Sequence, residues 1–185
     1  TLTREREVQR TDLREAMEDP LKTAFRLLRS TLFGDRHYGL PRLGTEESLE
    51  KIDCQALLDH HLRFMTRQNG VLAVFGDIDP DVTADLCEGI FASLPEGSTS
   101  ETASGTGQET NSGEISRRLA KEQAVIAIGY PGAHITSEDI PALELIHEYC
   151  SNMAGPLFTR LREELGLAYY VNATQFHGLG SGLFA

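Results

Sequence analysis

Histidines are the first residues of this sequence that could bind a metal or transfer a proton. They stand at six positions: His37, His60, His61, His134, His147 and His177. The stretch HEYCS at 147–151 begins like the zinc motif HExxH, but Ser151 stands where that motif needs its second histidine. His60 and His61 are adjacent, so on a helix their side chains point about 100° apart and do not easily share one metal. We therefore expect His60 and His61 on a helix surface and His147 in a core.

A second stretch of polar groups is RLREELGLAYYVNA, residues 160–173. Its pattern is typical of a charged helix that ends at Gly166 and is followed at once by a strand. Arg162 lies on the predicted helix, and Tyr169 lies seven positions later on the predicted strand. A chain reversal at Gly166 lets both side chains face one space.

Helices with clear start signals are predicted on both sides of the chain's centre. They cover residues 4–19, 19–34, 53–66, 79–95, 136–152 and 153–166, with a further short segment at 44–52. Asp19, Asp53 and Asp79 each precede a helix as an N-cap, and Gly34 ends the second of these helices. Capped helices of this kind need a sheet or other helices against which to pack.

Short apolar runs between turn signals predict buried strands at 69–78, 122–132 and 167–176. In the second half of the chain, two strands flank a pair of helices in the order β–α–α–β. The pattern therefore predicts an α+β fold with a mixed or antiparallel sheet and helices packed on one face.

Residues 96–116 interrupt this pattern, because Ser, Thr, Gly and Glu dominate there and Ile115 is the one large apolar side chain. Such a composition buries too little apolar surface to offset the entropy of ordering, so a flexible linker is predicted. The chain is accordingly divided into residues 1–95, a linker at 96–116, and residues 117–185. Both ends of the chain look cut from something longer.

Charge and composition narrow the classes of partner. The formal net charge is -11, which argues against a nucleic-acid partner. No apolar run approaches the roughly 20 residues that span a bilayer, so no membrane partner is expected. The three cysteines are not closely spaced, and they form neither a CxxC metal motif nor a disulfide framework.

Three stretches together resemble one family of proteins. They are HYGLPRLGTEESLEKI (37–52), NGVLAVFGDIDPDVTADLCEGIFASLP (69–95) and GPLFTRLREELGLAYYVNA (155–173), in that order. The chain resembles the pitrilysin/insulinase-type (inverzincin) zinc peptidases, which include the mitochondrial processing peptidase. The resemblance covers nearly all of the chain except the linker, and it implies the metalloprotease fold of homologous α+β halves around a substrate chamber.

That family binds zinc through HxxEH and a further Glu well downstream, since the chemistry needs two His, a carboxylate and a Glu that takes a proton from water. No histidine of this sequence begins HxxEH. The downstream Glu would fall near the start of the chain, where the carboxylates are Glu5, Glu7, Glu15 and Glu18. The family's spacing lands instead on Arg14. The resemblance therefore implies the half without zinc, or a degenerate zinc motif before residue 1.

In the family, the half without metal contributes an Arg and a Tyr toward the substrate at the other half's zinc. Arg162 and Tyr169 match that pattern, so the resemblance implies them as the catalytic residues of this segment. Arg162 would donate hydrogen bonds to a peptide carbonyl, and Tyr169 would stabilise an oxyanion. The alternative is that Arg162 interacts only with its helix C-terminus and that Tyr169 lies in the core.

The implied function is a segment of an insulinase-family zinc metallopeptidase. As the non-metal half, it would close the peptide chamber and contact an extended peptide, with no catalysis alone. No cofactor is expected in this segment, and zinc is expected in a homologous partner half, in the same chain or in a separate subunit. The alternative is a catalytically inactive structural or scaffold homologue. A cytoplasmic or periplasmic location would follow for a bacterial protein, and the sequence leaves the substrate and the oligomeric state open.

Overall fold

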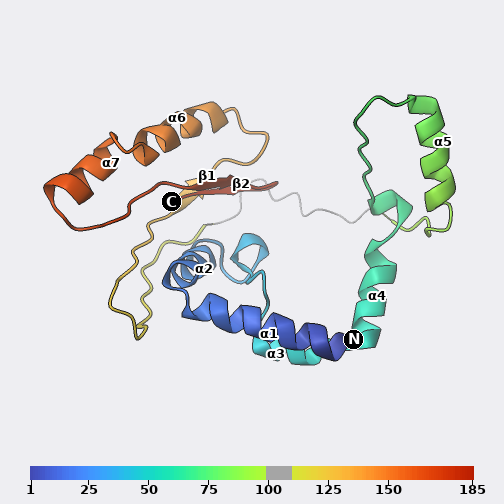
Figure 1. Ribbon diagram of the computed structural model, residues 1–185, viewed down its shortest axis with the longest axis horizontal. Coiled ribbons are helices and arrows are strands. Elements are labelled where there is room, and N and C mark those ends of the chain that lie inside the picture. Colours follow the sequence, from blue (N-terminus) through green and yellow to red (C-terminus); the bar gives the residue numbers. More distant parts are fainter. Residues whose placement is uncertain (99–109) are drawn as a thin grey trace. The chain divides into compact units, whose positions relative to one another are not determined.

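The computed structural model describes residues 1–98 and 110–185 (Figure 1). Within them the elements are α1 (Leu2–Glu18), α2 (Pro20–Phe33), η1 (His37–Gly39), α3 (Glu46–Lys51), α4 (Cys54–Phe64), η2 (Arg67–Asn69), α5 (Pro80–Phe91), β1 (Tyr130–Gly132), α6 (Ile140–Ser151), α7 (Pro156–Phe158), η3 (Thr159–Glu164), β2 (Gln175–His177) and β3 (Gly182–Phe184). The centre of the predicted linker, residues 99–109, lies outside the described residues. The division at 96–116 therefore stays a prediction.

Contacts among the described residues define two compact units. One is drawn from residues 1–6 and 47–98, and the other from residues 7–46 and 110–185. The first unit contains α4, η2 and α5, and the backbone after α5 returns to η2 through Arg67 N–H, which donates to the Pro95 carbonyl at 2.9 Å. The second unit contains α2, the helices α6 and α7, and all three described strands.

The helix boundaries follow the predicted caps. A carboxylate oxygen of Asp19 accepts from Lys22 N–H at 3.0 Å, and that of Asp53 accepts from Ala56 N–H at 2.7 Å. Asp79 caps α5 in the same way. Each contact satisfies a backbone donor that the first helical turn leaves without an intrahelical partner. Gly34 ends α2 with a φ of 65°, a conformation that favours glycine.

The sheet of the second unit is antiparallel, with the strand order β1-β3-β2. Phe176 of β2 pairs with Leu183 of β3, and both pack against Leu32 and Phe33 of α2. The next residue, His177, points to the opposite side of the strand, and its Nε2 lies 3.7 Å from Glu144 Oε1 of α6. The predicted α+β class with an antiparallel sheet is confirmed.

Tyr38 joins this core although it belongs to the loop after α2. Its ring lies 5.1 Å from that of Phe176 and 5.8 Å from that of Phe33, both edge-on, which is a favoured aromatic geometry. Its hydroxyl accepts the backbone N–H of Leu179 at 2.7 Å. Tyr38 therefore anchors this segment to the strands, a role that the sequence analysis did not predict.

The strand predictions were wrong over most of their length. Residues 70–79 form no strand, and the side chains of Val71 and Phe75 are 99% and 93% exposed. The predicted strands at 122–132 and 167–176 are reduced to their last residues, in β1 and at the start of β2. An apolar run signals a tendency to be buried, but a strand also needs a neighbouring backbone, and no described residue supplies one at these positions.

Candidate functional site

The predicted junction between helix and glycine turn is built by the last helical turns of the second unit. Helix α7 passes into η3, a π-helix, and Leu165 N–H donates to the carbonyl of Arg160, five residues earlier, at 3.1 Å. Leu167 N–H then donates to the Leu161 carbonyl at 2.9 Å. Gly166 has a φ of 59°, the left-handed conformation that closes many helices. Gly166 therefore ends the helix as predicted.

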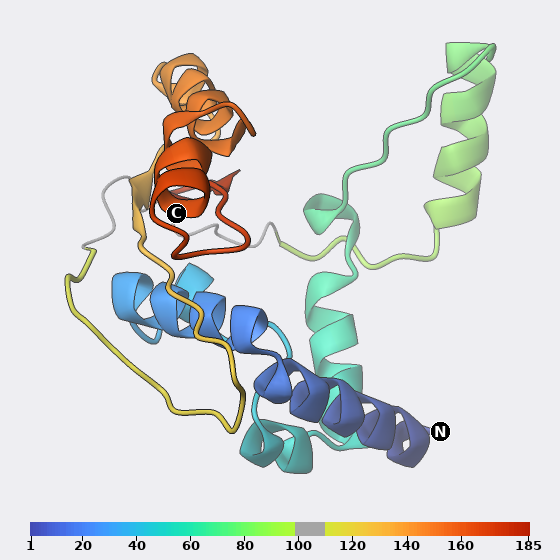
Figure 2. The same cartoon turned by 60° about the vertical axis from the view of Figure 1, so that its left-hand side comes forward.

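Beyond Gly166 the chain runs as a loop back toward the strands, which can be followed in the ribbon from η3 to β2 (Figure 2). The turn at Gly166 places the Tyr169 ring against the Arg162 guanidinium. The guanidinium carbon of Arg162 lies 4.7 Å from the centre of the Tyr169 ring, within the range of a cation–π contact. The two predicted site residues are thus in contact, one from the helix and one from the loop.

Both side chains of the Arg–Tyr pair are open to a ligand. Tyr169 is 82% exposed, so the alternative that places its ring in the core is wrong for the described structure. Arg162 is half-buried. Neither side chain makes a hydrogen bond or ion pair within residues 1–98 and 110–185, so the N–H donors and the phenol remain available.

Phe158 is the residue of this site that sequence reasoning missed. The guanidinium carbon of Arg162 lies 4.7 Å from the centre of its ring as well. The signal was present in the sequence, because an aromatic residue four positions before an Arg on a helix is placed to contact it. Arg162 therefore has two aromatic neighbours, one from its own helix and one from across the turn.

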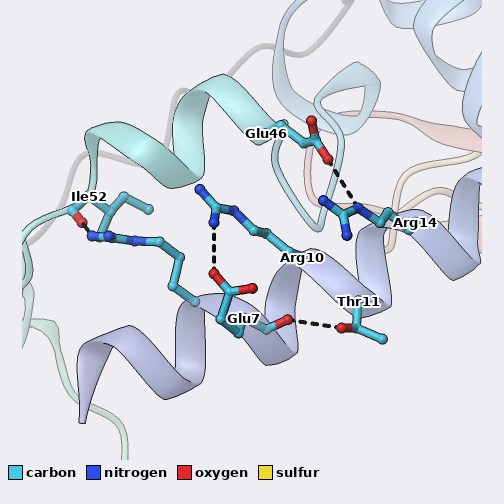
Figure 3. A network of polar contacts seen from close by, with 7 residues as sticks. Glu7, Arg10, Thr11, Arg14, Glu46 and Ile52 are labelled. Atoms are coloured by element: carbon cyan, nitrogen blue, oxygen red, sulfur yellow. Dashed lines mark hydrogen bonds and ion pairs between the residues drawn. The ribbon is translucent and has the colours of Figure 1, made fainter.

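The carboxylates of α1 form no metal site among the residues that the structure describes, and Figure 3 shows the polar contacts that Glu7 makes instead. Glu7 pairs with Arg10 at 2.7 Å, and Arg14, which occupies the position expected for a metal-binding Glu, lies 3.4 Å from Glu46. The same figure shows the Thr11 hydroxyl, which donates to the backbone carbonyl of Glu7 at 3.0 Å. These residues make a charged helix face.

The histidines do not form a metal site either. His60 and His61 are exposed on α4, and the His60 ring lies 4.5 Å from the ring of Phe64. His147 is half-buried rather than in a core, and its Nδ1 has no hydrogen-bond partner among the described residues, although it lies 3.8 Å from Glu148 Oε1. His177 Nδ1 lies 3.2 Å from the Ala133 carbonyl.

Across residues 1–98 and 110–185, no group of three or more His, Cys, Asp or Glu side chains is placed to hold a metal ion. The residues present therefore do not fit zinc, which needs three protein ligands even at a catalytic centre with an open position. A search of the same residues for a helix long and apolar enough to cross a membrane finds none.

A separate groove in the second unit runs along the apolar face of α2. It is lined by Leu27, Leu28 and Leu32 and by residues 110–131. Arg162 and Tyr169 are not part of its lining, so the groove and the Arg–Tyr pair are distinct features of this unit.

The fold is α+β, and no metal-holding group is found in the part of the chain that the structure describes. Residues 51–185 match the family described as the Peptidase M16 inactive domain, and the chain belongs to that family. This match confirms the resemblance to the pitrilysin/insulinase-type zinc peptidases.

Individual relatives agree with this assignment. An uncharacterized zinc protease of Rickettsia bellii is 26% identical over 189 residues, which cover 99% of this chain and 44% of the relative. The crystal structure of a peptidase M16 inactive domain from Pseudomonas fluorescens has a TM-score of 0.75 at 20% identity, covering 99% of this chain and 45% of that one. A chain of complex III2 from Candida albicans has a TM-score of 0.74 at 20% identity, covering 100% and 46%. The chain thus spans less than half the length of these proteins.

Proposed function

We propose that this chain is the non-metal half of an insulinase-type zinc metallopeptidase. In that role it closes the peptide chamber and contacts an extended peptide through Arg162 and Tyr169. It hydrolyses nothing by itself, because the zinc belongs to a homologous partner half. That half is in the same polypeptide or in a separate subunit.

The contact between Arg162 and Tyr169 is the observation that carries the proposal. The two side chains meet at 4.7 Å across the Gly166 turn, and neither is engaged by another polar group of the described residues. An Arg presents several N–H donors in one plane, which suits a peptide carbonyl, and a Tyr hydroxyl can donate to an oxygen that gains charge. The family assignment adds that such a domain accompanies a peptidase.

The test is Arg162→Ala in the full-length protein together with its zinc-bearing half, with peptide hydrolysis as the readout. We expect kcat/KM to fall between about tenfold and a thousandfold, the scale of losing a donor that binds the transition state. Arg160→Ala is the matched control, since Arg160 lies on the same helix but pairs with Glu164. Equal activities of the Arg162→Ala variant and the unsubstituted protein would reject the proposed role.

A catalytically inactive structural subunit is the second candidate. Its support is the chain from complex III2 of Candida albicans, which has the same fold. Fold alone does not determine activity, so the likeness leaves both candidates in place. A full-length protein that hydrolyses no peptide, although its partner half carries zinc, would favour the structural candidate.

A further inference from the structure

We propose that Phe158 is a positioning residue that holds the Arg162 guanidinium against Tyr169, so that the Arg donors are presented to a peptide in one orientation. This inference rests on the proposed function of Arg162, and it adds a residue to which neither the sequence pattern nor the comparisons assign a role. Phe158 itself does not touch the substrate.

The first support is that two aromatic rings lie at the same distance from the Arg162 guanidinium. Its guanidinium carbon lies 4.7 Å from the ring centre of Phe158 and 4.7 Å from that of Tyr169. Tyr169 is on an exposed loop, whereas Phe158 is half-buried at the junction of α7 and η3. The better anchored of the two rings is therefore Phe158.

The second support is the conformational entropy that an unrestrained Arg side chain would lose on binding a ligand. A free Arg side chain samples many rotamers, and the entropy of ordering it opposes any contact it makes with a ligand. A ring stacked on the guanidinium restricts those rotamers without using the N–H donors, because the contact is made through the ring face. Phe158 thus reduces the entropy that is lost when a peptide binds.

The third support is the local backbone. Residues 159–164 form a π-helix, which is rare in proteins and is often found at functional sites. It begins directly after Phe158 and contains Arg162, so the unusual turn sets the spacing between the ring and the cation. Arg160, on the same π-helix, pairs with Glu164 instead of with a ring. The aromatic surroundings are therefore specific to Arg162.

The experiment compares Phe158→Leu, Phe158→Tyr, Arg162→Ala and the double variant Phe158→Leu/Arg162→Ala in the full-length protein with its zinc-bearing half. We expect Phe158→Leu to lower kcat/KM about two- to fivefold, the factor that an exposed cation–π contact carries. Phe158→Tyr keeps the ring and is expected to keep the activity. The double variant should equal Arg162→Ala alone, because the effect of Phe158 passes through Arg162.

An NMR measurement on Arg-labelled full-length protein supplies a readout that does not depend on activity. The side-chain N–H signal of Arg162 should lie upfield because of the two rings, and Phe158→Leu should move it toward the position of a free Arg. Arg160→Ala should leave the signal unchanged. A signal that does not move in Phe158→Leu would overturn the proposal, whatever the kinetics show.

The kinetic outcomes separate this inference from the proposed function. If Phe158→Leu costs as much in the Arg162→Ala background as alone, Phe158 acts by packing and the inference is wrong. If Arg162→Ala lowers activity but Phe158→Leu does not, the inference is wrong and the proposed function stands. If Arg162→Ala changes nothing, the proposed function is wrong and the inference fails with it.

Discussion

Arg160 and Arg162 lie two positions apart on one π-helix, yet their guanidinium groups have different surroundings. Arg160 pairs with the carboxylate of Glu164, and Arg162 contacts the rings of Phe158 and Tyr169. An exposed ion pair of the first kind contributes little to stability. The second arrangement leaves the cation without a counter-ion among the described residues, which is the state required to bind a carbonyl or carboxylate.

The hydroxyl of Tyr169 can be tested apart from its ring. Tyr169→Phe keeps the ring that contacts Arg162 and removes only the O–H donor. If the full-length protein hydrolyses peptides as proposed, we expect this variant to lower kcat between about tenfold and a thousandfold, as for the loss of one oxyanion donor. Tyr170→Phe is the control, because the neighbouring Tyr170 is also exposed. Equal decreases of kcat in the Tyr169→Phe and Tyr170→Phe variants would show that Tyr169 has no role that its neighbour lacks.

At the residue scale, the sequence located part of the candidate site. The family resemblance implied Arg162 and Tyr169 as site residues, and the structure brings the two side chains into contact. Phe158 was not predicted, because an aromatic residue on a helix is usually part of a core. Only the position of the Arg162 guanidinium next to the Phe158 ring shows that this ring contacts a cation instead of filling a core.

At the scale of elements, the helix caps could be predicted from the sequence, whereas the partners of the strands could not. Asp19 and Asp53 act within one turn of their own helices, so their caps could be predicted from neighbouring residues alone. A strand depends on a partner that is distant in sequence, and the run at 69–78 carries no information about where that partner lies. This is why the helix boundaries were close and the strands were not.

The Gly166 turn gives a prediction for stability. Gly166→Ala forces a side chain into a left-handed conformation, with no neighbouring atom within 4 Å to clash, so the cost is backbone strain of about 1–2 kcal/mol in the free energy of unfolding. Gly89→Ala in α5 also meets open space, but in a helical conformation, and should stabilise by about 0.5–1 kcal/mol. Denaturant unfolding of both variants measures the contrast, and shifts of the same sign would contradict it.

A second prediction concerns the exposed segment that contains Phe75. Its ring is 93% exposed among the described residues, although its sequence context is that of a buried strand. In residues 1–185 alone, we expect Phe75→Ala to change the free energy of unfolding by less than about 0.5 kcal/mol. In the full-length protein the same change should cost about 3–5 kcal/mol, as for a buried Phe. Equal effects in the two proteins would show that nothing covers this segment.

For the molecule as a whole, the missing metal group is the feature that bears on function. Within residues 1–98 and 110–185, the carboxylates of α1 are interspersed with arginines, and no histidine lies in a group of three or more side chains that could hold a metal ion. We expect elemental analysis of the purified chain to find no stoichiometric zinc after exposure to a chelator of moderate affinity. One tightly held zinc per chain would overturn the assignment of this segment to the non-metal half.

The core of the second unit has a consequence for synthesis. Leu32 and Phe33 come early in the chain, whereas Leu183, against which they pack, comes about 150 positions later. At the usual pace of a ribosome, the nascent α2 waits for about eight to thirty seconds before Leu183 is made. During that time we expect the apolar side chains of α2 to stay exposed, because this core cannot close before Leu183 has been made.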